Sequence, residues 1–220
     1  MDNETALAIL AALKKSYPDA RCGLDYETPY ELAVATILSA QCTDKRVNIV
    51  TKSLFSQAST PQAIAEMGVD RLQRVIRPCG LSNAKAKNIV SMSEILLREH
   101  GGMLPETVDE LVRLPGIGRK TANVVASNAF GQDAIAVDTH VFRVSNRLGL
   151  ARAANPLQTE KDLNACLPKN EWSLAHHLLI RHGRDVCHAR KPACQGCALL
   201  AYCESGEAGA ARAEAGGAGA

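Results

Sequence analysis

The chain has 220 residues, which is enough for one large or two small domains with a buried core. Only 4% of the residues are aromatic, and alanine, leucine and valine are plentiful, which favours helices over a β-sandwich. The net charge of +2 argues neither for nor against binding to nucleic acid. No apolar run approaches the roughly 18 residues of a membrane span, and the N-terminus lacks a signal-peptide pattern. We therefore expect a soluble, intracellular protein without a membrane partner, and a monomer.

The first hundred residues contain several patterns that start helices. Residues 4–14 are expected to form an amphipathic helix with three leucines on one face: Leu7, Leu10 and Leu13. Thr28 is followed by a proline and, three residues on, by Glu31, which combines a capping box with proline in the first turn. Further helices are expected to be capped at Thr43, Thr60, Asp70 and Ser82.

Two loops between these helices carry side chains that suit contact with a nucleic acid. Gln41 lies in a polar loop beside an apolar helix, and a plain interhelical loop is the simpler interpretation. Leu81 follows Gly80 in a tight turn, where its side chain is expected to be exposed. One exposed leucine needs no explanation, but it would also suit an apolar wedge that unstacks base pairs. Lys85 and Lys87 flank this turn and could hold phosphate, although exposed helix lysines are common.

A helix–hairpin–helix is predicted in the middle of the chain. Thr107 and Glu110 form a capping box for a short helix, which residues 115–118 (Pro-Gly-Ile-Gly) end. A second helix then starts at Arg119. Its unpaired backbone N–H groups point out of a glycine-rich turn, which makes an anion site suited to a DNA phosphate. The residues expected at this site are Gly116, Gly118, Arg119 and Thr121.

Lys120 lies in the first turn of that second helix, which is the unfavourable end for a cation. An unperturbed lysine amine is almost wholly protonated at pH 7, so a nucleophilic role needs desolvation or further cations nearby. Arg119 is one such cation in sequence. The alternative is that both side chains only hold phosphate.

Asp138 follows an extended connector at residues 131–137 and is expected to cap the next helix. A capping carboxylate is held rigidly, so it could also accept a proton or steady positive charge during a reaction. Further helices are expected to start at Asn155 and Asn170. We interpret three histidines near the last helix as packing or surface residues: His176, His177 and His182.

Four of the eight cysteines form a candidate metal or cluster site. They are separated by six, two and five residues: Cys187, Cys194, Cys197 and Cys203. The single Cys-x-x-Cys pair argues mildly against zinc, because zinc ribbons generally use two such pairs. The remaining cysteines are interpreted as buried reduced thiols: Cys22, Cys42, Cys79 and Cys166.

A basic stretch lies beside this cluster. It has a local charge of +3 and consists of Arg181, Arg184, Arg190 and Lys191 against Asp185. It could be a phosphate-binding face or only a solvated surface. Residues 204–220 hold mostly alanine and glycine with a net charge of −2, and we expect them to form a disordered tail.

The segment Leu-Pro-Gly-Ile-Gly-Arg-Lys-Thr-Ala with the later Val-Asp-Thr-His resembles the helix–hairpin–helix DNA glycosylase superfamily. Within it the chain is most similar to the bacterial endonuclease III family, from about Thr28 to Cys203. The resemblance implies that Lys120 is the nucleophile and Asp138 its catalytic partner. It also implies that Gln41 enters the gap left by an extruded base and that Leu81 is the wedge. The four clustered cysteines match the family's loop that binds a 4Fe–4S cluster.

The resemblance further implies a bifunctional DNA glycosylase and abasic-site lyase of base excision repair, working in the bacterial cytoplasm and on the nucleoid. Its partner would be double-stranded DNA with oxidised or ring-saturated pyrimidines or abasic sites. Two alternatives remain open. One is a monofunctional glycosylase that uses a water positioned by Asp138, and the other is a non-catalytic DNA-binding module with a structural metal.

We therefore expect an all-α protein with two lobes and a cleft at which Lys120 and Asp138 meet. One lobe comprises residues 23–133 and contains the helix–hairpin–helix. The other combines residues 1–22 with 134–203, a pairing of chain ends that only the resemblance implies.

Overall fold

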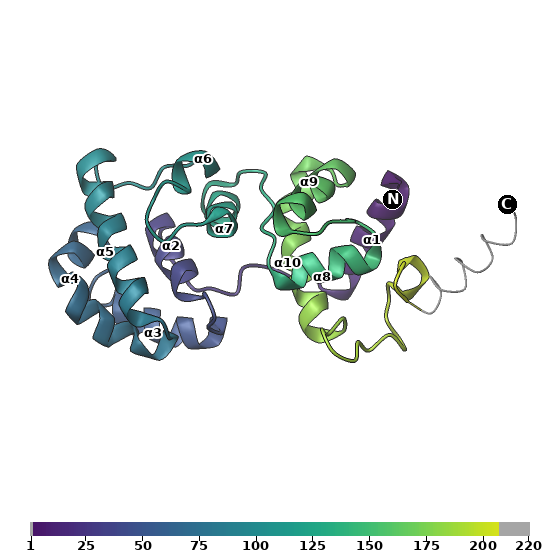
Figure 1. Cartoon of the computed structure of the whole chain (residues 1–220), viewed down its shortest axis with the longest axis horizontal. Helices are drawn as coiled ribbons and strands as arrows, with labels where there is room; N and C mark the ends of the chain where they lie inside the picture. The colour runs from purple at the N-terminus through teal and green to yellow at the C-terminus, as the bar shows by residue number, and fades with distance from the viewer. Residues whose placement is uncertain (1, 207–220) are drawn as a thin grey trace, which may run out of the picture. The chain divides into compact units, whose positions relative to one another are not determined.

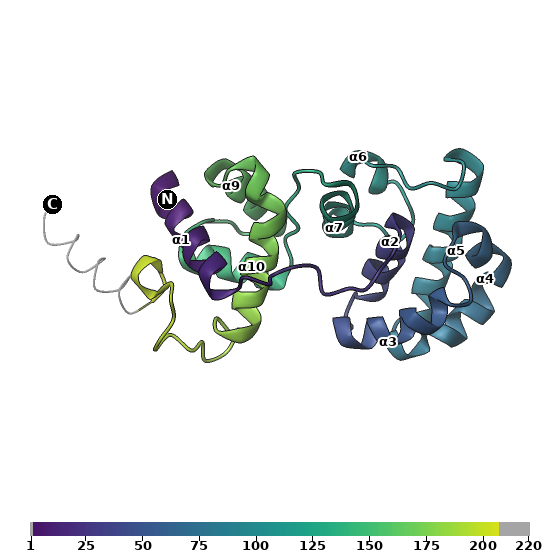
Figure 2. The ribbon, with the colours of Figure 1, turned by 180° about the vertical axis from the view of Figure 1, so that it is seen from behind.

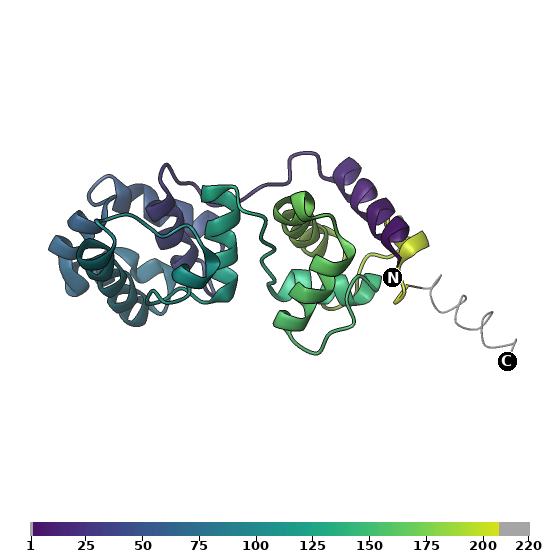
Figure 3. The ribbon, with the colours of Figure 1, turned by 90° about the horizontal axis from the view of Figure 1, so that it is seen from above.

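The structure is a computed structural model, and it describes residues 2–206. Within that range every regular element is a helix, as predicted (Figure 1). The chain forms two compact units. Residues 22–132 form the first, and the chain up to Arg21 together with the chain from Asp133 onward forms the second. The chain passes between the two units after Arg21 and again after Gln132, and Figure 3 shows these connecting segments. No helix in the described part is long and apolar enough to cross a membrane.

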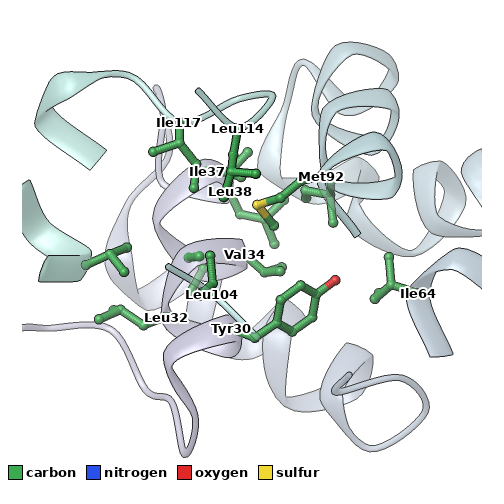
Figure 4. Close-up of a cluster of buried hydrophobic side chains, with 14 of the residues drawn as sticks. Tyr30, Leu32, Val34, Ile37, Leu38, Ile64, Met92, Leu104, Leu114 and Ile117 are labelled. Carbon is green, nitrogen blue, oxygen red and sulfur yellow. The ribbon is translucent and has the colours of Figure 1, made fainter. Parts of the chain in front are cut away.

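The first unit, which we call the hairpin unit, is built around one buried helix. Its elements are α2 (Pro29–Leu38), α3 (Asp44–Phe55), α4 (Pro61–Ile76), the 3-10 helix η1 (Arg77–Cys79), α5 (Ser82–Glu99), α6 (Val108–Leu111) and α7 (Arg119–Phe130). Every residue of α2 after Pro29 is buried, and α3, α5 and α7 pack around it. Figure 4 shows Leu32 and Val34 of α2 in this core, together with Met92 of α5 and Leu114.

Threonine side chains start four of these helices. In α2, the Thr28 hydroxyl accepts a hydrogen bond from the N–H of Glu31 at 3.2 Å. The Glu31 carboxylate in turn accepts the N–H of Glu27, one residue before the cap, at 2.6 Å. Each cap supplies an acceptor to an N–H group that has no partner within the helix. The other three caps are Thr43, Thr60 and Thr107, all as predicted.

The second unit, which we call the cysteine unit, joins the N-terminal helix to the last third of the chain. Its elements are α1 (Asn3–Ser16), α8 (Thr139–Leu148), α9 (Pro156–Cys166), η2 (Lys169–Glu171), α10 (Trp172–Asp185) and η3 (Leu200–Tyr202). Helix α10 packs against both α1 and α8, and α8 also packs against α9 (Figure 2). An ion pair of 2.7 Å between Lys14 and Glu171 ties α1 to the turn before α10.

Four local predictions about helices were wrong. Asp70 does not cap a helix, because it lies inside α4, whose non-helical residue is Gly68. Leu7 is 46% exposed, because the buried stripe of α1 runs through Ala6, Ile9, Leu10 and Leu13 instead. Helix α10 starts at Trp172 without a side-chain cap, because a 3-10 turn occupies the position expected for a start at Asn170. In α5 the N-cap residue is Leu81 itself and not Ser82.

Only the beginning of the predicted tail lies within the described residues. Glu204 accepts a hydrogen bond from the Arg152 side chain at 2.8 Å. The N–H of Ser205 donates to the carbonyl of Arg147 at 3.0 Å. These contacts belong to the cysteine unit, and residues 207–220 lie outside the described part.

Candidate nucleic-acid and catalytic site

The turn between α6 and α7 requires glycine at position 116. Gly116 has a φ of +80°, and a Cβ there would lie 2.9 Å from Cβ of Asn88 and 3.3 Å from Cδ1 of Ile37. Both the backbone conformation and the lack of space therefore exclude a side chain. Ile117 is buried and anchors the turn, whereas Gly118 has an ordinary φ of −85° and serves as the N-cap of α7.

The N-terminus of α7 has the features of an anion site. Its N-cap residue is Gly118, which has no side chain to cap the helix, and the first N–H groups of a helix have no acceptor within it. Arg119 and Lys120 are exposed and Thr121 is half-buried. Because Lys120 is exposed, the desolvation that a nucleophilic amine needs is not supplied by the folded chain alone.

Gln41 and Leu81 share an uncommon backbone conformation. Their φ angles are +55° and +49°, which places both in the left-handed region without being glycine. This conformation costs roughly 1–2 kcal/mol for a residue with a side chain. Both side chains are exposed, Leu81 by 57%, which confirms the prediction for that residue. Such strain persists where the surrounding structure enforces it, and it occurs often at functional sites.

The sequence predicts Lys85 on the surface beside this turn, and the structure contradicts that prediction. It is only 4% exposed, and its ammonium group donates to the carbonyls of Leu38, Ala40 and Cys79 at 2.8, 2.8 and 2.9 Å. All three of its N–H donors are therefore used, and the suggestion that Lys85 holds phosphate is wrong. Lys87 is exposed on the same helix.

Asp138 caps α8 as predicted. Its Oδ1 atom accepts hydrogen bonds from the N–H groups of His140 and Val141, both at 2.8 Å. The side chain is half-buried, and the two bonds fix its orientation while Oδ2 is left for another partner. Asp138 belongs to the cysteine unit and Lys120 to the hairpin unit.

The four clustered cysteines line one pocket in the cysteine unit, together with Arg147 and His182. Burial raises the pKa of the Cys197 and Cys203 thiols, and backbone N–H groups close to their sulfur atoms act in the opposite direction. Among residues 2–206, no group of three or more His, Cys, Asp or Glu side chains is arranged to hold a single metal ion.

Two arginines on α8 hold the cysteine loop. Arg147 donates to Sγ of Cys187 at 3.3 Å and to the carbonyls of His188 and Ala189 at 2.7 and 3.1 Å. Arg143 donates to the carbonyl of Cys187 at 3.1 Å. Neither role could be predicted from the sequence, because these bonds join positions about forty residues apart.

The basic stretch beside the cysteines is exposed. Arg181 forms an ion pair of 2.7 Å with Asp185, one turn further along α10. Arg184, Arg190 and Lys191 are exposed as well, and Lys191 has a left-handed φ of +53°.

The sequence matches the HhH-GPD superfamily of base excision DNA repair proteins over residues 34–169, more than half of the chain. The chain belongs to this superfamily. It is 50% identical over 192 residues to an endonuclease III of Bacillus subtilis (strain 168), covering 87% of this chain and 88% of that protein. It is also similar in structure to a non-covalent endonuclease III–DNA complex, with a TM-score of 0.89 and 45% identity over 97% of this chain and 99% of the other. A trapped endonuclease III–DNA covalent intermediate matches with the same TM-score, identity and coverage.

The likeness to these HhH-GPD proteins covers both units, since 97% of the chain is aligned. It therefore includes the hairpin with Lys120, the capping Asp138 and the loop with four cysteines. Of the residues predicted from sequence, the structure brings the four cysteines to one cavity, and it places Gln41 and Leu81 on loops that both contact Lys85.

Proposed function

We propose that this chain is a bifunctional DNA glycosylase and abasic-site lyase of base excision repair, acting on oxidised or ring-saturated pyrimidines in double-stranded DNA. One observation carries the proposal. Lys120 is an exposed amine in the first turn of α7, in a chain 45% identical, along 97% of its length, to a protein trapped covalently on DNA. A tether for phosphate alone would not require an amine, since arginine binds phosphate at least as well.

The chemistry begins when a damaged base leaves the duplex, which costs a few kcal/mol of stacking and pairing. The neutral amine of Lys120 attacks the sugar C1′ and the bond from C1′ to the base breaks, so that the base departs with the bonding electrons and takes up a proton. Opening of the sugar ring gives an imine between Nζ and C1′. The imine acidifies the C2′–H bond, and loss of that proton expels the 3′ phosphate and nicks the strand.

Because Lys120 is exposed, bound DNA has to supply the desolvation that frees its amine. The open N–H groups of α7, together with Gly116, Gly118, Arg119 and Thr121, would bind the phosphate next to the lesion. We propose that Asp138 acts on the same nucleotide, accepting a proton or steadying positive charge on the sugar. Its cap geometry supports this, since two bonds of 2.8 Å hold the carboxylate in one orientation.

We propose that Gln41 fills the gap left by the extruded base and that Leu81 is the wedge that unstacks its neighbours. Their exposure and strained backbones support these roles, because an ordinary loop would carry glycine or asparagine at such positions. The exposed Arg184, Arg190 and Lys191 would add phosphate contacts on the cysteine unit.

The donor set of the cysteine unit fits a 4Fe–4S cluster held by Cys187, Cys194, Cys197 and Cys203. Four thiols line the pocket, and backbone N–H groups approach two of the sulfur atoms. When bound, the cluster would fix the cysteine loop, which buries few apolar side chains of its own, against α8 and α10. The protein would then work as a monomer in the bacterial cytoplasm and on the nucleoid when bound to DNA. Its domains would be residues 23–133 and residues 1–22 with 134–203.

Borohydride reduction on DNA with an abasic site tests the proposal directly. Reduction traps an imine as a stable amine, so the wild type should form a covalent protein–DNA adduct that Lys120→Arg does not form. Arginine keeps the charge at the α7 N-terminus but does not readily form an imine, so DNA binding should survive the change. Base release without an adduct would instead favour a water positioned by Asp138, and binding without either reaction would favour a DNA-binding module. Strand cleavage that persists undiminished in Lys120→Arg would refute the lyase mechanism.

A further inference from the structure

Lys85 is a buried cation whose partners are backbone carbonyls only. Its ammonium group donates three hydrogen bonds of 2.8 to 2.9 Å, and the residue is 4% exposed. The side chain of a lysine has three N–H donors, so each donor has one acceptor and none remains for solvent or substrate.

The three carbonyls explain why a cation is tolerated there. Leu38 is the last residue of α2, Ala40 lies two residues beyond it, and Cys79 is the last residue of η1. The last carbonyls of a helix lack partners within it and carry partial negative charge, so a cation at this position satisfies and stabilises them. Burial lowers the pKa of Lys85, whereas the neighbouring Cys79 and Cys42 thiols act to raise it.

These same two helix ends carry the two strained residues. Ala40 immediately precedes Gln41, and Cys79 lies two residues before Leu81. The backbone N–H of Lys85 also donates to the carbonyl of Leu81 at 3.0 Å. One residue therefore contacts the loop of Gln41 through its side chain and the turn of Leu81 through its backbone, although the two loops are about forty residues apart in sequence.

The thiols of Cys42 and Cys79 form a second contact between these loops. Burial, and then the adjacent Cys42, raise the pKa of the Cys79 thiol to about 11. The Cys79 thiol is therefore protonated near neutral pH, and a thiol is only a weak hydrogen-bond donor. The ammonium of Lys85 is thus the stronger link.

We propose that Lys85 is a positioning residue that holds Gln41 and Leu81 at a set separation, so that both enter the duplex together when a base is extruded. The inference rests on the proposed roles of Gln41 and Leu81. Without the ammonium, three buried carbonyls lose their donors and the loops must move to reach water. Left-handed backbone at Gln41 and Leu81 persists only where the surroundings enforce it, so that movement would also release both residues from this conformation.

The test compares Lys85→Met with Lys52→Met. Methionine keeps the length of the side chain and removes its donors, and Lys52 is an exposed lysine on α3 in the same unit. Two single-turnover rates are measured for each variant. One is base release from a duplex with one ring-saturated pyrimidine, and the other is cleavage of a single-stranded oligonucleotide with an abasic site, where no duplex gap has to be filled.

Lys85→Met is expected to slow duplex base release about tenfold while single-strand cleavage stays within about twofold of wild type. Lys52→Met should change neither rate by more than about twofold. Equal losses in the two rates would show that Lys85 only maintains the fold, and unchanged base release would overturn the proposal as well. If Lys85→Met does not fold, Lys85→Arg is judged by the same ratio, because a flat guanidinium cannot place its donors as an ammonium does.

Leu81→Ala separates this inference from the function on which it rests. If Leu81→Ala alone leaves duplex base release unchanged, the wedge role itself is wrong. If Leu81→Ala slows base release by the same factor in the wild type and in the Lys85→Met background, that result would support the wedge role of Leu81 and refute the positioning role of Lys85. The proposal predicts that the effect of Leu81→Ala shrinks to about twofold or less once Lys85 is methionine, because the two positions act as one unit.

Discussion

The structural role of Asp138 as a helix cap can be separated by experiment from the chemical role that we propose for it. As the N-cap of α8 it needs only an acceptor oxygen at Oδ1, because both of its hydrogen bonds go to that atom. In catalysis it needs a negative charge or the ability to accept a proton. Asparagine keeps the acceptor oxygen and removes the charge, whereas alanine removes both.

The magnitudes of these two changes differ enough to be measured. Replacing an aspartate N-cap with alanine lowers the free energy of unfolding by about 0.5–2 kcal/mol. Asparagine caps about as well as aspartate and loses only the interaction of the charge with the helix dipole, about 0.3–1 kcal/mol. For a chain of this size, a loss of 1 kcal/mol lowers Tm by roughly 2–4 °C. Loss of a positioned acid–base group typically slows a reaction by about 10²–10⁴-fold.

We therefore expect Asp138→Asn to keep a Tm close to wild type and to lose at least about a hundredfold in single-turnover base release. Asp138→Ala should lose a similar factor in base release together with a lower Tm. Thermal unfolding by circular dichroism and base release from a duplex with one ring-saturated pyrimidine provide the two measurements. If Asp138→Asn releases base at the wild-type rate, Asp138 is only a helix cap and its assigned chemistry is wrong.

Three further predictions follow from the described contacts. Gly116→Ala should lower the free energy of unfolding by about 2–4 kcal/mol in urea denaturation, because it combines left-handed strain with a 2.9 Å clash. Gly118→Ala should lower it by less than about 1 kcal/mol, and equal losses in the two variants would contradict this account of the turn. Burial raises the pKa of Tyr30, so above about pH 10 only the unfolded chain loses this proton and the free energy of unfolding falls with rising pH. In Tyr30→Phe this free energy should fall less over the same pH range, and an equal fall in the two proteins would refute the assignment. Cys194→Ser should yield colourless protein without iron, whereas Cys166→Ser should stay yellow-brown; a colourless wild type with stoichiometric zinc would refute the cluster.

Much of the fold was predictable because its signals are local. A threonine cap, its partner three residues later and a proline in the first turn all act within one helical turn, and the caps at Thr28, Thr43, Thr60 and Thr107 were found this way. The same holds for Asp138 and for the glycine turn before α7. The stripe of α1 was misjudged because Leu7 and Ile9 both fit a helical period, and only packing decides between them.

The candidate site was predictable in its residue types and less so in its surroundings. The spacing of the four cysteines predicted a metal or cluster site, and the position of Lys120 at a helix N-terminus marked it as a candidate functional residue. The arginines that hold the cysteine loop were missed, because an arginine on an amphipathic helix is ordinary until its acceptors are known. Lys85 was misplaced for the same reason. Its acceptors come from two helix ends, one of them 45 to 47 residues away.

Four positions that violate a local preference lie in the hairpin unit, and Lys191, with its left-handed φ, lies in the cysteine unit. Lys120 is a cation at a positive helix end, Gln41 and Leu81 adopt a glycine conformation, and Lys85 is a buried charge. The first three are locally unfavourable, whereas the three carbonyl acceptors of Lys85 offset the burial of its charge. At Gly116, by contrast, local preference and packing agree. We propose that Lys120, Gln41 and Leu81, which local preference disfavours, are retained for their roles at DNA and not for the stability of the fold.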